Sequence, residues 1–171
     1  MRARLDKRPS IERLRQYVAY DPETGALIWR ITSGRAIEGR AAGGVDPSTG
    51  YHRVRIDGHM LLTHHVVWAL VKGEWPLQLD HEDRDKSNNR VGNLRPATQQ
   101  QNMGNMGRPR HNTSGMKGVS FHKATGKWQA QISRNGQHVG LGVYVTKEEA
   151  ATAYEAAAKE HFGEFARAES R

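Results

Sequence analysis

The sequence predicts an α+β protein made of two small modules rather than one large domain. Hydrophobic residues make up only 36% of the 171 residues, which allows small packed cores but no large one. Short alternating segments, typical of antiparallel strands, are interspersed with compact helical segments. A stretch rich in Gly, Asn, Pro and Arg divides them. We therefore expect a first module at residues 1–103, a linker at 104–117 that becomes ordered on a partner, and a second module at 118–171.

The first module begins with a short helix and a strand. Residues 10–18 have the pattern of a helix with Ser10 as its N-cap. The turn residues in DPETG then precede a strand that starts at Leu27–Trp29. Residues 30–45 are rich in Gly and Arg, so we expect them to form a loop.

A hairpin and an apolar helix follow. Tyr51–Ile56 alternates well, and Asp57-Gly58 predicts a tight turn into a second strand at His59–Leu62. Thr63–Lys72 is a compact apolar helix that Gly73 and Pro76 should end. The hairpin and the helix lead directly into the most polar part of the module.

The central stretch predicts the order strand, loop, strand, helix. A short strand at Leu77–Asp80 is followed by a polar loop from Asp83 to Gly92, and a second strand is expected at Leu94–Ala97. Thr98 should cap a helix that carries Asn102. A carboxylate and an imidazole, Asp80-His81, thus end the first strand, and an amide lies on the helix.

The second module predicts a three-stranded antiparallel sheet packed on one helix. Its strands are expected at Gly118–His122, Lys127–Ser133 and His138–Tyr144, with turns at Ala124–Gly126 and Asn135-Gly136. Thr146 and Glu149 predict a capping box for an Ala-rich helix at Lys147–Phe162, which ends at Gly163.

Strand alternation assigns the two faces of this sheet. The apolar set should form the core and pack on Ala150, Ala151, Tyr154 and Ala158 of the helix; it comprises Val119, Phe121, Trp128, Ala130, Ile132, Val139, Leu141 and Val143. The opposite face should carry Ser120, His122, Gln129, Gln131, Ser133 and His138, with Lys117 at its edge and Arg134 near a turn. Trp128 is therefore expected in the core rather than on a nucleic-acid base.

Charge and composition limit the classes of partner. The formal net charge is +8, and residues 108–147 contain no Asp or Glu, which indicates a surface for a polyanion. A merely solvated basic face is the plainer alternative. The chain has no cysteine, so disulfides and thiolate zinc sites are excluded and a reducing cytoplasm is expected. No apolar run is long enough to span a membrane, and no signal peptide is expected.

The side chains of the central stretch suit phosphodiester hydrolysis. Asp80 offers a carboxylate and Asn102 an amide oxygen, which are hard ligands for one Mg²⁺ or Mn²⁺ ion. His81 points to the opposite face of the strand from Asp80, so it should act as the general base on a water molecule instead. Arg95 is a candidate contact to the phosphate.

The same residues resemble a known family. Asp80-His81, Asn93 and Asn102 look like the motif of HNH (ββα-metal) nucleases, in the subtype of phage and intron homing endonucleases whose last histidine is replaced by asparagine. The resemblance extends from Tyr20 to Asn102 through the stretches YDPETG, GYHRVRIDG, THHVVWALVKGEWP and LDHEDRDKSNNRVGNLRPAT. It implies that Asp80 and Asn102 bind the metal, that His81 is the base and that Asn93 bridges the loop. No structural zinc is expected.

The second module resembles an AP2/ERF-type DNA-binding domain over KGVSFHKATGKWQAQISRNGQHVGLGVYVTKEEAATAYEAAAKEHFGEFA. Such domains lay a three-stranded sheet into the major groove. The resemblance implies double-stranded DNA as the partner. The candidate contacts are Arg108, Arg110, Lys117, Ser120, His122, Lys123, Gln129, Gln131, Ser133, Arg134 and His138. Plant relatives are richer in Arg and Trp here, so a similar sequence preference is not expected.

These observations predict a phage-type, metal-dependent DNA endonuclease in the host cytoplasm. We expect a monomer that nicks one strand. A dimer that cuts both strands is the alternative that the sequence leaves open. A DNA-binding regulator with a vestigial nuclease site and an RNA-directed protein are the alternatives; a major-groove sheet argues against the second. One of His64 and His65 is expected to pack beneath the strand of Asp80 and the other to act as a cap or face solvent, with a phosphate contact as the alternative.

Overall fold

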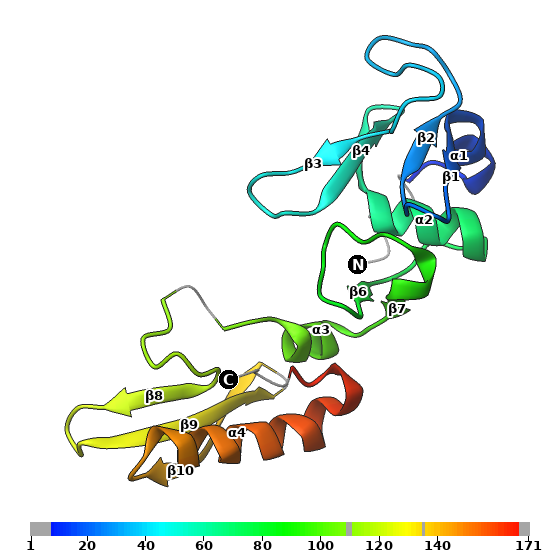
Figure 1. Cartoon of the computed structure of the whole chain (residues 1–171). Coiled ribbons are helices and arrows are strands. Elements are labelled where there is room, and N and C mark those ends of the chain that lie inside the picture. Colours follow the sequence, from blue (N-terminus) through cyan, green and yellow to red (C-terminus); the bar gives the residue numbers. More distant parts are fainter. Residues whose placement is uncertain (1–7, 109–110, 135, 168–171) are drawn as a thin grey trace. The chain divides into compact units, whose positions relative to one another are not determined.

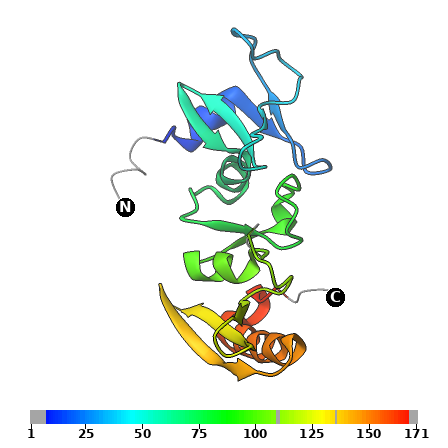
Figure 2. The same cartoon turned by 90° about the vertical axis from the view of Figure 1, so that its left-hand side faces the viewer.

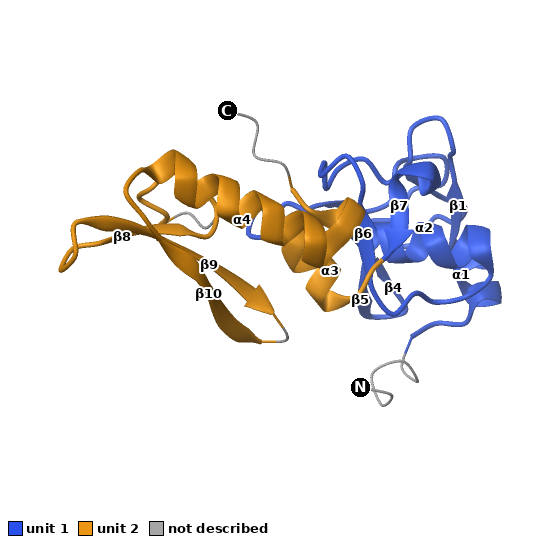
Figure 3. Ribbon diagram, turned by 90° about the horizontal axis from the view of Figure 1, so that it is seen from below, with its two compact units in different colours: residues 1–96 blue, residues 97–171 orange. Residues whose placement is uncertain are grey.

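The computed structural model describes residues 8–108, 111–134 and 136–167, and it divides the chain into two compact units. Unit 1 comprises residues 1–96 and unit 2 comprises residues 97–171 (Figure 3). Each unit contains small antiparallel sheets and helices, as the α+β prediction requires. No helix among the described residues is long and apolar enough to cross a membrane.

Unit 1 begins with α1 (Ile11–Tyr17), β1 (Val18–Tyr20) and β2 (Leu27–Trp29). The Ser10 side chain accepts a hydrogen bond from the Arg13 amide and so caps α1, as predicted. The sheet of β3 (Gly44–Val45), β4 (His52–Ile56) and β5 (His59–Leu62) follows, in that order. The strand β3 lies in a segment predicted as loop, because its two residues are recognisable as a strand only through their pairing with β4.

The hairpin turn and the apolar helix of unit 1 match the sequence prediction closely. Asp57 and Gly58 both have positive φ, at 49° and 79°, as a tight hairpin turn requires. The helix α2 (Thr63–Lys72) ends at Gly73, whose left-handed conformation permits the C-cap. Its residues Val66 and Val67 are fully buried and help to form one apolar core with Leu14, Leu27 and Val54.

The last part of unit 1 is the two-stranded sheet of β6 (Leu79–His81) and β7 (Leu94–Pro96) (Figure 1). The one-turn helix η2 (Val91–Asn93) lies between the two strands in the sequence and leads directly into β7. Leu79 and Leu94 are buried in the core of the unit. These two anchors fix the short hairpin, so the side chains of β6 have defined surroundings.

Unit 2 contains α3 (Gln99–Asn105), β8 (Val119–His122), β9 (Lys127–Arg134), β10 (Gln137–Tyr144), α4 (Lys147–Phe162) and the one-turn helix η3 (Gly163–Phe165). The three strands form one antiparallel sheet in the order β10-β9-β8, and α4 runs along one face of it (Figure 2). The predicted Thr146–Glu149 capping box begins α4. The predicted turn residue Asn135 lies outside the described residues.

The predicted core face of this sheet needs a correction. Val119, Ala130 and Ile132 are buried as expected, but Phe121 and Val139 are 49% and 40% exposed because they lie towards the ends of the sheet. Val143 is 55% exposed, and it pairs with Gln129 on the opposite face. The cause is a register shift between Gly140 and Gly142, which reverses the alternation of β10 beyond it.

The helix α3 belongs structurally to unit 2, although the predicted boundary lay after residue 103. Gly104 packs so closely on Phe162 that a Cβ atom there would lie 2.6 Å from the Phe162 Cγ atom. The amide of Arg167 also donates to the Gly104 carbonyl, at 3.3 Å. The sequence signal for a linker was the Gly-rich composition, but Gly104 serves close packing instead.

Part of the predicted linker is also an ordered, hydrogen-bonded loop of unit 2. Ser114 is 7% exposed, and its hydroxyl contacts the carbonyl oxygens of Met116 and Val119 at 2.9 and 2.7 Å. The Asn112 side chain donates to the Met116 carbonyl at 2.8 Å. Ordering of this segment by DNA therefore remains a prediction only for Pro109 and Arg110, which lie outside the described residues.

Candidate active site

The β6–β7 hairpin positions Asp80 and His81 on opposite faces of one strand. Asp80 pairs with Arg95 across the hairpin and His81 pairs with Leu94. Because adjacent strand residues point in opposite directions, the carboxylate and the imidazole have separate surroundings. The two side chains are 9% and 4% exposed, respectively, so both are set into unit 1 rather than displayed on a loop.

The Asp80 carboxylate is held by Arg95. The Arg95 guanidinium donates from Nε and Nη2 to Oδ2 of Asp80, at 3.1 and 3.0 Å. The side chains of Asp80 and Arg95 are 10% and 17% exposed, so water screens the pair only weakly. Sequence reasoning assigned Arg95 to the phosphate, whereas the structure places its guanidinium on the carboxylate expected to bind the metal.

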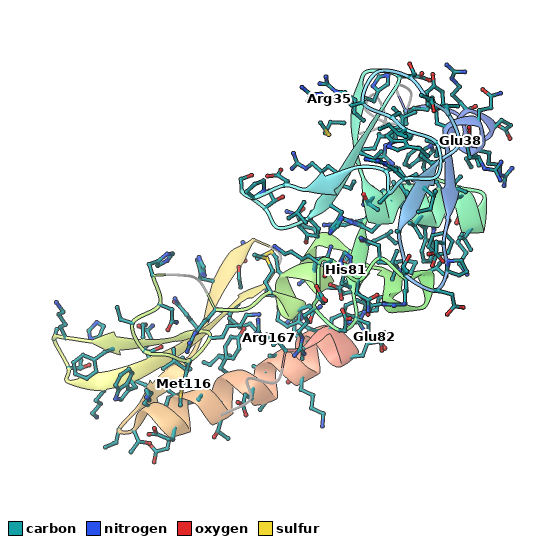
Figure 4. All side chains as sticks on the ribbon, turned by 45° about the horizontal axis from the view of Figure 1, so that its top comes forward. Arg35, Glu38, His81, Glu82, Met116 and Arg167 are labelled. Atoms are coloured by element: carbon teal, nitrogen blue, oxygen red, sulfur yellow. The ribbon has the colours of Figure 1, made fainter. Side chains whose placement is uncertain are left out.

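The side chain of His81, which is labelled in Figure 4, lies close to two other rings. Its ring centroid is 4.8 Å from that of His64 and 5.9 Å from that of Tyr51. Burial lowers the pKa of His81, against the opposing effects of Asn89 and the neighbouring carboxylates. The imidazole is therefore neutral at neutral pH, which is the protonation state that a general base needs.

His64 and His65 lie on α2 beneath this strand. Burial lowers the pKa of His64 to about 2 and that of His65 to about 4. The two rings contact each other edge to face, with centroids 4.7 Å apart. His64 packs against His81 as the packing prediction expected, and it adds a neutral ring rather than a charge to the site.

Asn89 is a side chain of the site that sequence reasoning missed. It is 2% exposed, and its Oδ1 atom lies 3.3 Å from Nε2 of His81. Its Nδ2 group donates to the Ser87 carbonyl at 3.1 Å. Two consecutive asparagines in a polar loop were the available signal, but such residues usually indicate a turn.

Asn93 bridges the loop between the two strands. Its Nδ2 group donates to Oδ1 of Asp83 and to the Asn88 carbonyl, both at 2.8 Å, and its Oδ1 accepts from the Asp83 amide at 3.0 Å. The Asn93 carbonyl also accepts from the Glu82 amide at 2.9 Å. These bonds tie the loop that follows β6 to the residue that precedes β7.

The loop carboxylates Asp83 and Asp85 are engaged within the loop. Hydrogen bonds from the side chain and the amide of Ser87 lower the pKa of Asp85. Partial burial acts to raise the pKa of Asp83, but hydrogen bonds from Asn88, the Asp85 amide and Asn93 outweigh it and the pKa is lowered. Both carboxylates are therefore ionised and serve the shape of the loop.

Asn102 lies on α3 and therefore in unit 2. Thr98 and Gln101 form the capping box that begins this helix. The described geometry brings together Asp80, His81 and Asn93 with Arg95, all within unit 1, whereas Asn102 belongs to the other compact unit.

The donor set was tested for a divalent cation. Among the described residues, no three His, Asp or Glu side chains form a group that could hold a metal ion. Asp80 is a single, largely buried hard oxygen ligand, which suits a divalent cation that keeps several waters and binds through one or two protein oxygens plus phosphate.

The predicted DNA-contacting residues fall into four groups, of which the last is Lys117 alone. Pairing places Ser120, Gln129, Gln131, Ser133 and His138 on the sheet face opposite buried Ala130, and His122 pairs with Lys127 at the end of that face. Lys123, Arg134 and Arg108 are exposed, although Arg108 also donates to the Gly115 carbonyl. Arg110 lies outside the described residues.

Lys117 has contacts within unit 2 that the sequence did not predict. Its ammonium group donates to the carbonyls of Met103, Gly104 and Met106, at 3.0, 2.7 and 2.6 Å. Lys117 therefore stabilises the carboxyl end of α3, and its contact to DNA stays a prediction.

Comparison with known proteins identifies the domain that contains Asp80 and His81. Residues 61–104 match the HNH endonuclease family. Protein 3.8 of Escherichia phage T7 is 36% identical over 76 residues, which cover 43% of this chain and 63% of that protein. An uncharacterized HNH endonuclease of Acanthamoeba polyphaga mimivirus is 35% identical over 111 residues, covering 64% of this chain and 57% of its own length. The chain thus spans less than two thirds of either relative.

The second unit has a shorter match. An AP2-like ethylene-responsive transcription factor of Arabidopsis thaliana is 45% identical over 49 residues, which are 28% of this chain and 14% of the plant protein. No solved structure matches. Residues 61–104 thus match the HNH endonuclease family, as the sequence resemblance implied for this segment. The AP2/ERF-type identity of unit 2 stays a prediction.

Proposed function

We propose that this protein is a metal-dependent DNA endonuclease of the viral HNH type that hydrolyses phosphodiester bonds, and that it acts as a homing-type enzyme in the host cytoplasm. The observation that carries the proposal is the arrangement on β6, where a buried carboxylate and a neutral, buried imidazole alternate on one strand of an HNH domain. The alternation separates a cation-binding side chain from a proton-accepting one.

The proposed metal site uses Asp80 and Asn102, which the HNH motif pairs. One bound Mg²⁺ or Mn²⁺ ion would supply charge stabilisation at the phosphate and at the leaving 3′-oxygen. Asp80 holds its carboxylate in unit 1, where two hydrogen bonds from Arg95 orient it. Asn102 contributes its amide oxygen from α3, the helix that the sequence motif assigns to the site.

His81 accepts the proton of the attacking water, while Asn93 keeps the two strands and the loop in register. The imidazole is neutral because of its burial, so it accepts a proton at neutral pH without first losing one. The hydrogen bonds of Asn93 to Asp83 and Asn88 hold the loop that covers this side of β6. The residue roles follow the family motif, and these contacts support them.

Unit 2 would hold double-stranded DNA through the polar face of its sheet. This face presents glutamine and serine side chains and His138, and the acid-free stretch 108–147 supplies its positive charge. Gln129 and Gln131 suit base contacts, while Arg108, Lys123 and Arg134 suit phosphate contacts. One active site acts on one strand, so we expect a monomer that nicks.

A supercoiled plasmid tests the nuclease. Wild-type protein should convert it to the nicked form with Mg²⁺ or Mn²⁺ but not with EDTA, and His81→Ala should lower the rate by about 100-fold or more. Asp80→Asn should lose metal-dependent cutting as well, while His59→Gln, which changes an exposed residue on β5, should cut normally. If the wild type leaves the plasmid intact with every divalent metal tried, the site is vestigial and the regulator alternative holds.

A gel shift tests the second unit, using residues 97–171 and the full chain carrying His81→Ala. Both should bind duplex DNA, and binding should weaken steeply with salt. Gln131→Ala should weaken binding by about 5- to 150-fold, the range of one base contact. Glu155→Gln, an exposed change on α4, is the control. Absence of a shift at low salt would leave the sheet face as a solvated surface.

A further inference from the structure

We propose that Asn89 is a positioning residue for His81: it holds the imidazole as the Nε2–H tautomer and so presents Nδ1 as the proton-accepting atom. The inference rests on the proposed function for the role of His81 as the base. It assigns a role to a loop residue outside the positions of the HNH motif, and it specifies which ring nitrogen performs the chemistry.

The orientation of the Asn89 amide carries the first step. Its Nδ2 group donates to the Ser87 carbonyl at 3.1 Å, so the oxygen of the amide is the atom that faces His81. A flipped amide would place its oxygen against the Ser87 carbonyl oxygen, with two acceptors and no proton between them. An amide oxygen only accepts hydrogen bonds, so Nε2 of His81 must carry the proton.

The tautomer follows from that assignment. A neutral imidazole has one protonated nitrogen and one with a lone pair. Since Nε2–H donates to Oδ1 of Asn89, the lone pair resides on Nδ1 of His81. In the reaction, Nδ1 takes a proton from water and the ring becomes an imidazolium whose Nε2–H bond to the Asn89 oxygen remains in place and strengthens.

Neighbouring rings limit rotation of the imidazole. His64 packs against His81 edge to face, with centroids 4.8 Å apart and planes at 73°, and Tyr51 is tilted against it at 5.9 Å. A ring flip would move Cε1 to the position of Nε2 and Cδ2 to that of Nδ1, which would break the hydrogen bond to Asn89, and these contacts oppose it. The hydrogen bond of Asn89 thus selects one of two protonation patterns in a ring that is already confined.

The backbone around Asn89 is itself held by the N-terminal part of unit 1. The Arg90 side chain donates from Nε to the Glu23 carbonyl at 2.8 Å, and the Val91 amide donates to the Tyr20 hydroxyl at 2.9 Å. Gly25 approaches the same backbone so closely that a Cβ atom on Gly25 would lie 2.7 Å from the backbone nitrogen of Arg90. The DPETG turn therefore supports the residue that orients the base.

Nitrogen NMR of the histidine rings tests the proposal directly. Long-range ¹H–¹⁵N spectra at pH 7.5 distinguish the two neutral tautomers, and the His81 signals are assigned by their loss in His81→Gln. The wild type should show the Nε2–H pattern for His81. A wild-type Nδ1–H pattern would overturn the proposal, whatever the activity of the protein.

Two substitutions separate positioning from a merely structural role. Asn89→Leu removes the acceptor and should lower kcat for plasmid nicking by about 100-fold, with little change in KM and a mixture of His81 tautomers. Asn89→Asp keeps an oxygen facing Nε2 but loses the donor to the Ser87 carbonyl, so it should retain the Nε2–H tautomer with a kcat between those of the wild type and Asn89→Leu. Ser87→Ala leaves the Ser87 carbonyl in place and is the matched loop control.

The outcomes are distinct from those of the proposed function. If Asn89→Leu folds and keeps a pure Nε2–H tautomer, Asn89 does not set the tautomer and the proposal fails. If Asn89→Asp loses as much activity as Asn89→Leu while keeping the tautomer, the loss is structural and the proposal also fails. If the wild type cuts no DNA, the proposed function fails, and the NMR spectra still decide the tautomer.

Discussion

At the scale of single residues, the ion pair of Asp80 and Arg95 contributes to the stability of unit 1 and also orients a carboxylate of the proposed metal site. The pair is largely shielded from water, and each partner compensates the charge of the other. Removing one partner leaves a poorly solvated charge, which is costly, whereas an exposed pair contributes little. The arrangement explains how a carboxylate can be accommodated inside unit 1 before any cation binds.

We expect Arg95→Ala to lower the free energy of unfolding by about 2–4 kcal/mol, because Asp80 would lose its partner while remaining enclosed. Arg13→Ala is the matched control, since its pair with Asp57 has side chains 46% and 31% exposed. The control should lose at most about 1 kcal/mol. Urea unfolding monitored by tryptophan fluorescence measures both; equal losses would show that burial of the pair is unimportant.

The buried histidines predict a dependence of stability on pH. Burial lowers the pKa of His64 to about 2, so protonation favours the unfolded chain, where histidine titrates at its ordinary value near 6.5. Stability should therefore be complete above about pH 6.5 and decline as the pH falls. At pH 5 the loss should be about 2 kcal/mol from His64 alone, and His65 acts in the same direction.

Unfolding midpoints in urea at pH 7.5 and pH 5.0 measure this dependence. His64→Gln should reduce the difference between the two midpoints, because glutamine does not titrate. His59→Gln replaces an exposed histidine on β5 and should leave the difference unchanged. Identical midpoints at the two pH values for the wild type would contradict the prediction.

At the scale of secondary-structure elements, the turn between β1 and β2 supports the loop between β6 and β7. Gly25 has a φ of 80° and abuts the backbone of Asn89 and Arg90. A side chain at this position would be strained by the backbone conformation and would also collide with that loop. The turn is therefore part of the support of the active site, although it carries no chemistry.

Gly25→Ala should accordingly lower the free energy of unfolding by about 1–3 kcal/mol and should reduce nicking activity even under conditions in which the variant is fully folded. Gly58→Ala is a useful control, because Gly58 also has positive φ but a Cβ atom there would meet nothing within 4 Å. It should cost stability without reducing the nicking rate of the folded protein. Equal loss of activity in both variants would remove the specific role of the turn.

At the scale of the whole molecule, the compact units divide at residues 96 and 97, so α3 is part of the C-terminal unit. The helix contacts α4 and η3, and Lys117 binds the carbonyls at its end. Residues that the sequence motif assigns to one nuclease site are thus carried by two folding units. Unit 2 holds the helix of Asn102 in addition to the sheet that we propose binds DNA.

A fragment of residues 97–171 should therefore unfold cooperatively at a higher temperature than a fragment of residues 104–171. The shorter fragment lacks most of α3 and exposes the part of Phe162 on which Gly104 and its helix pack. Thermal unfolding by circular dichroism measures the difference, and equal midpoints would support the boundary after residue 103. Lys117→Met in the longer fragment should lower its midpoint, since three carbonyls lose their donor.

The local elements and the residue types of the site follow from the sequence alone. Capping residues, the Asp57-Gly58 turn and apolar periodicity predicted α1, the β4–β5 hairpin, α2 and α4 nearly to the residue, because each depends on neighbours along the chain. The sequence also placed Asp80 and His81 on opposite faces of one strand, since that follows from strand alternation.

How these parts are held depends on the tertiary structure. Asn89 beside His81, Arg95 on Asp80, Gly25 against the loop and Lys117 at the end of α3 are contacts between segments or side chains whose spacing in the sequence carries no periodic signal. The bulge that turns Val143 outward likewise depends on pairing with β9. Close packing and long-range hydrogen bonds selected these partners from many polar residues of the same type.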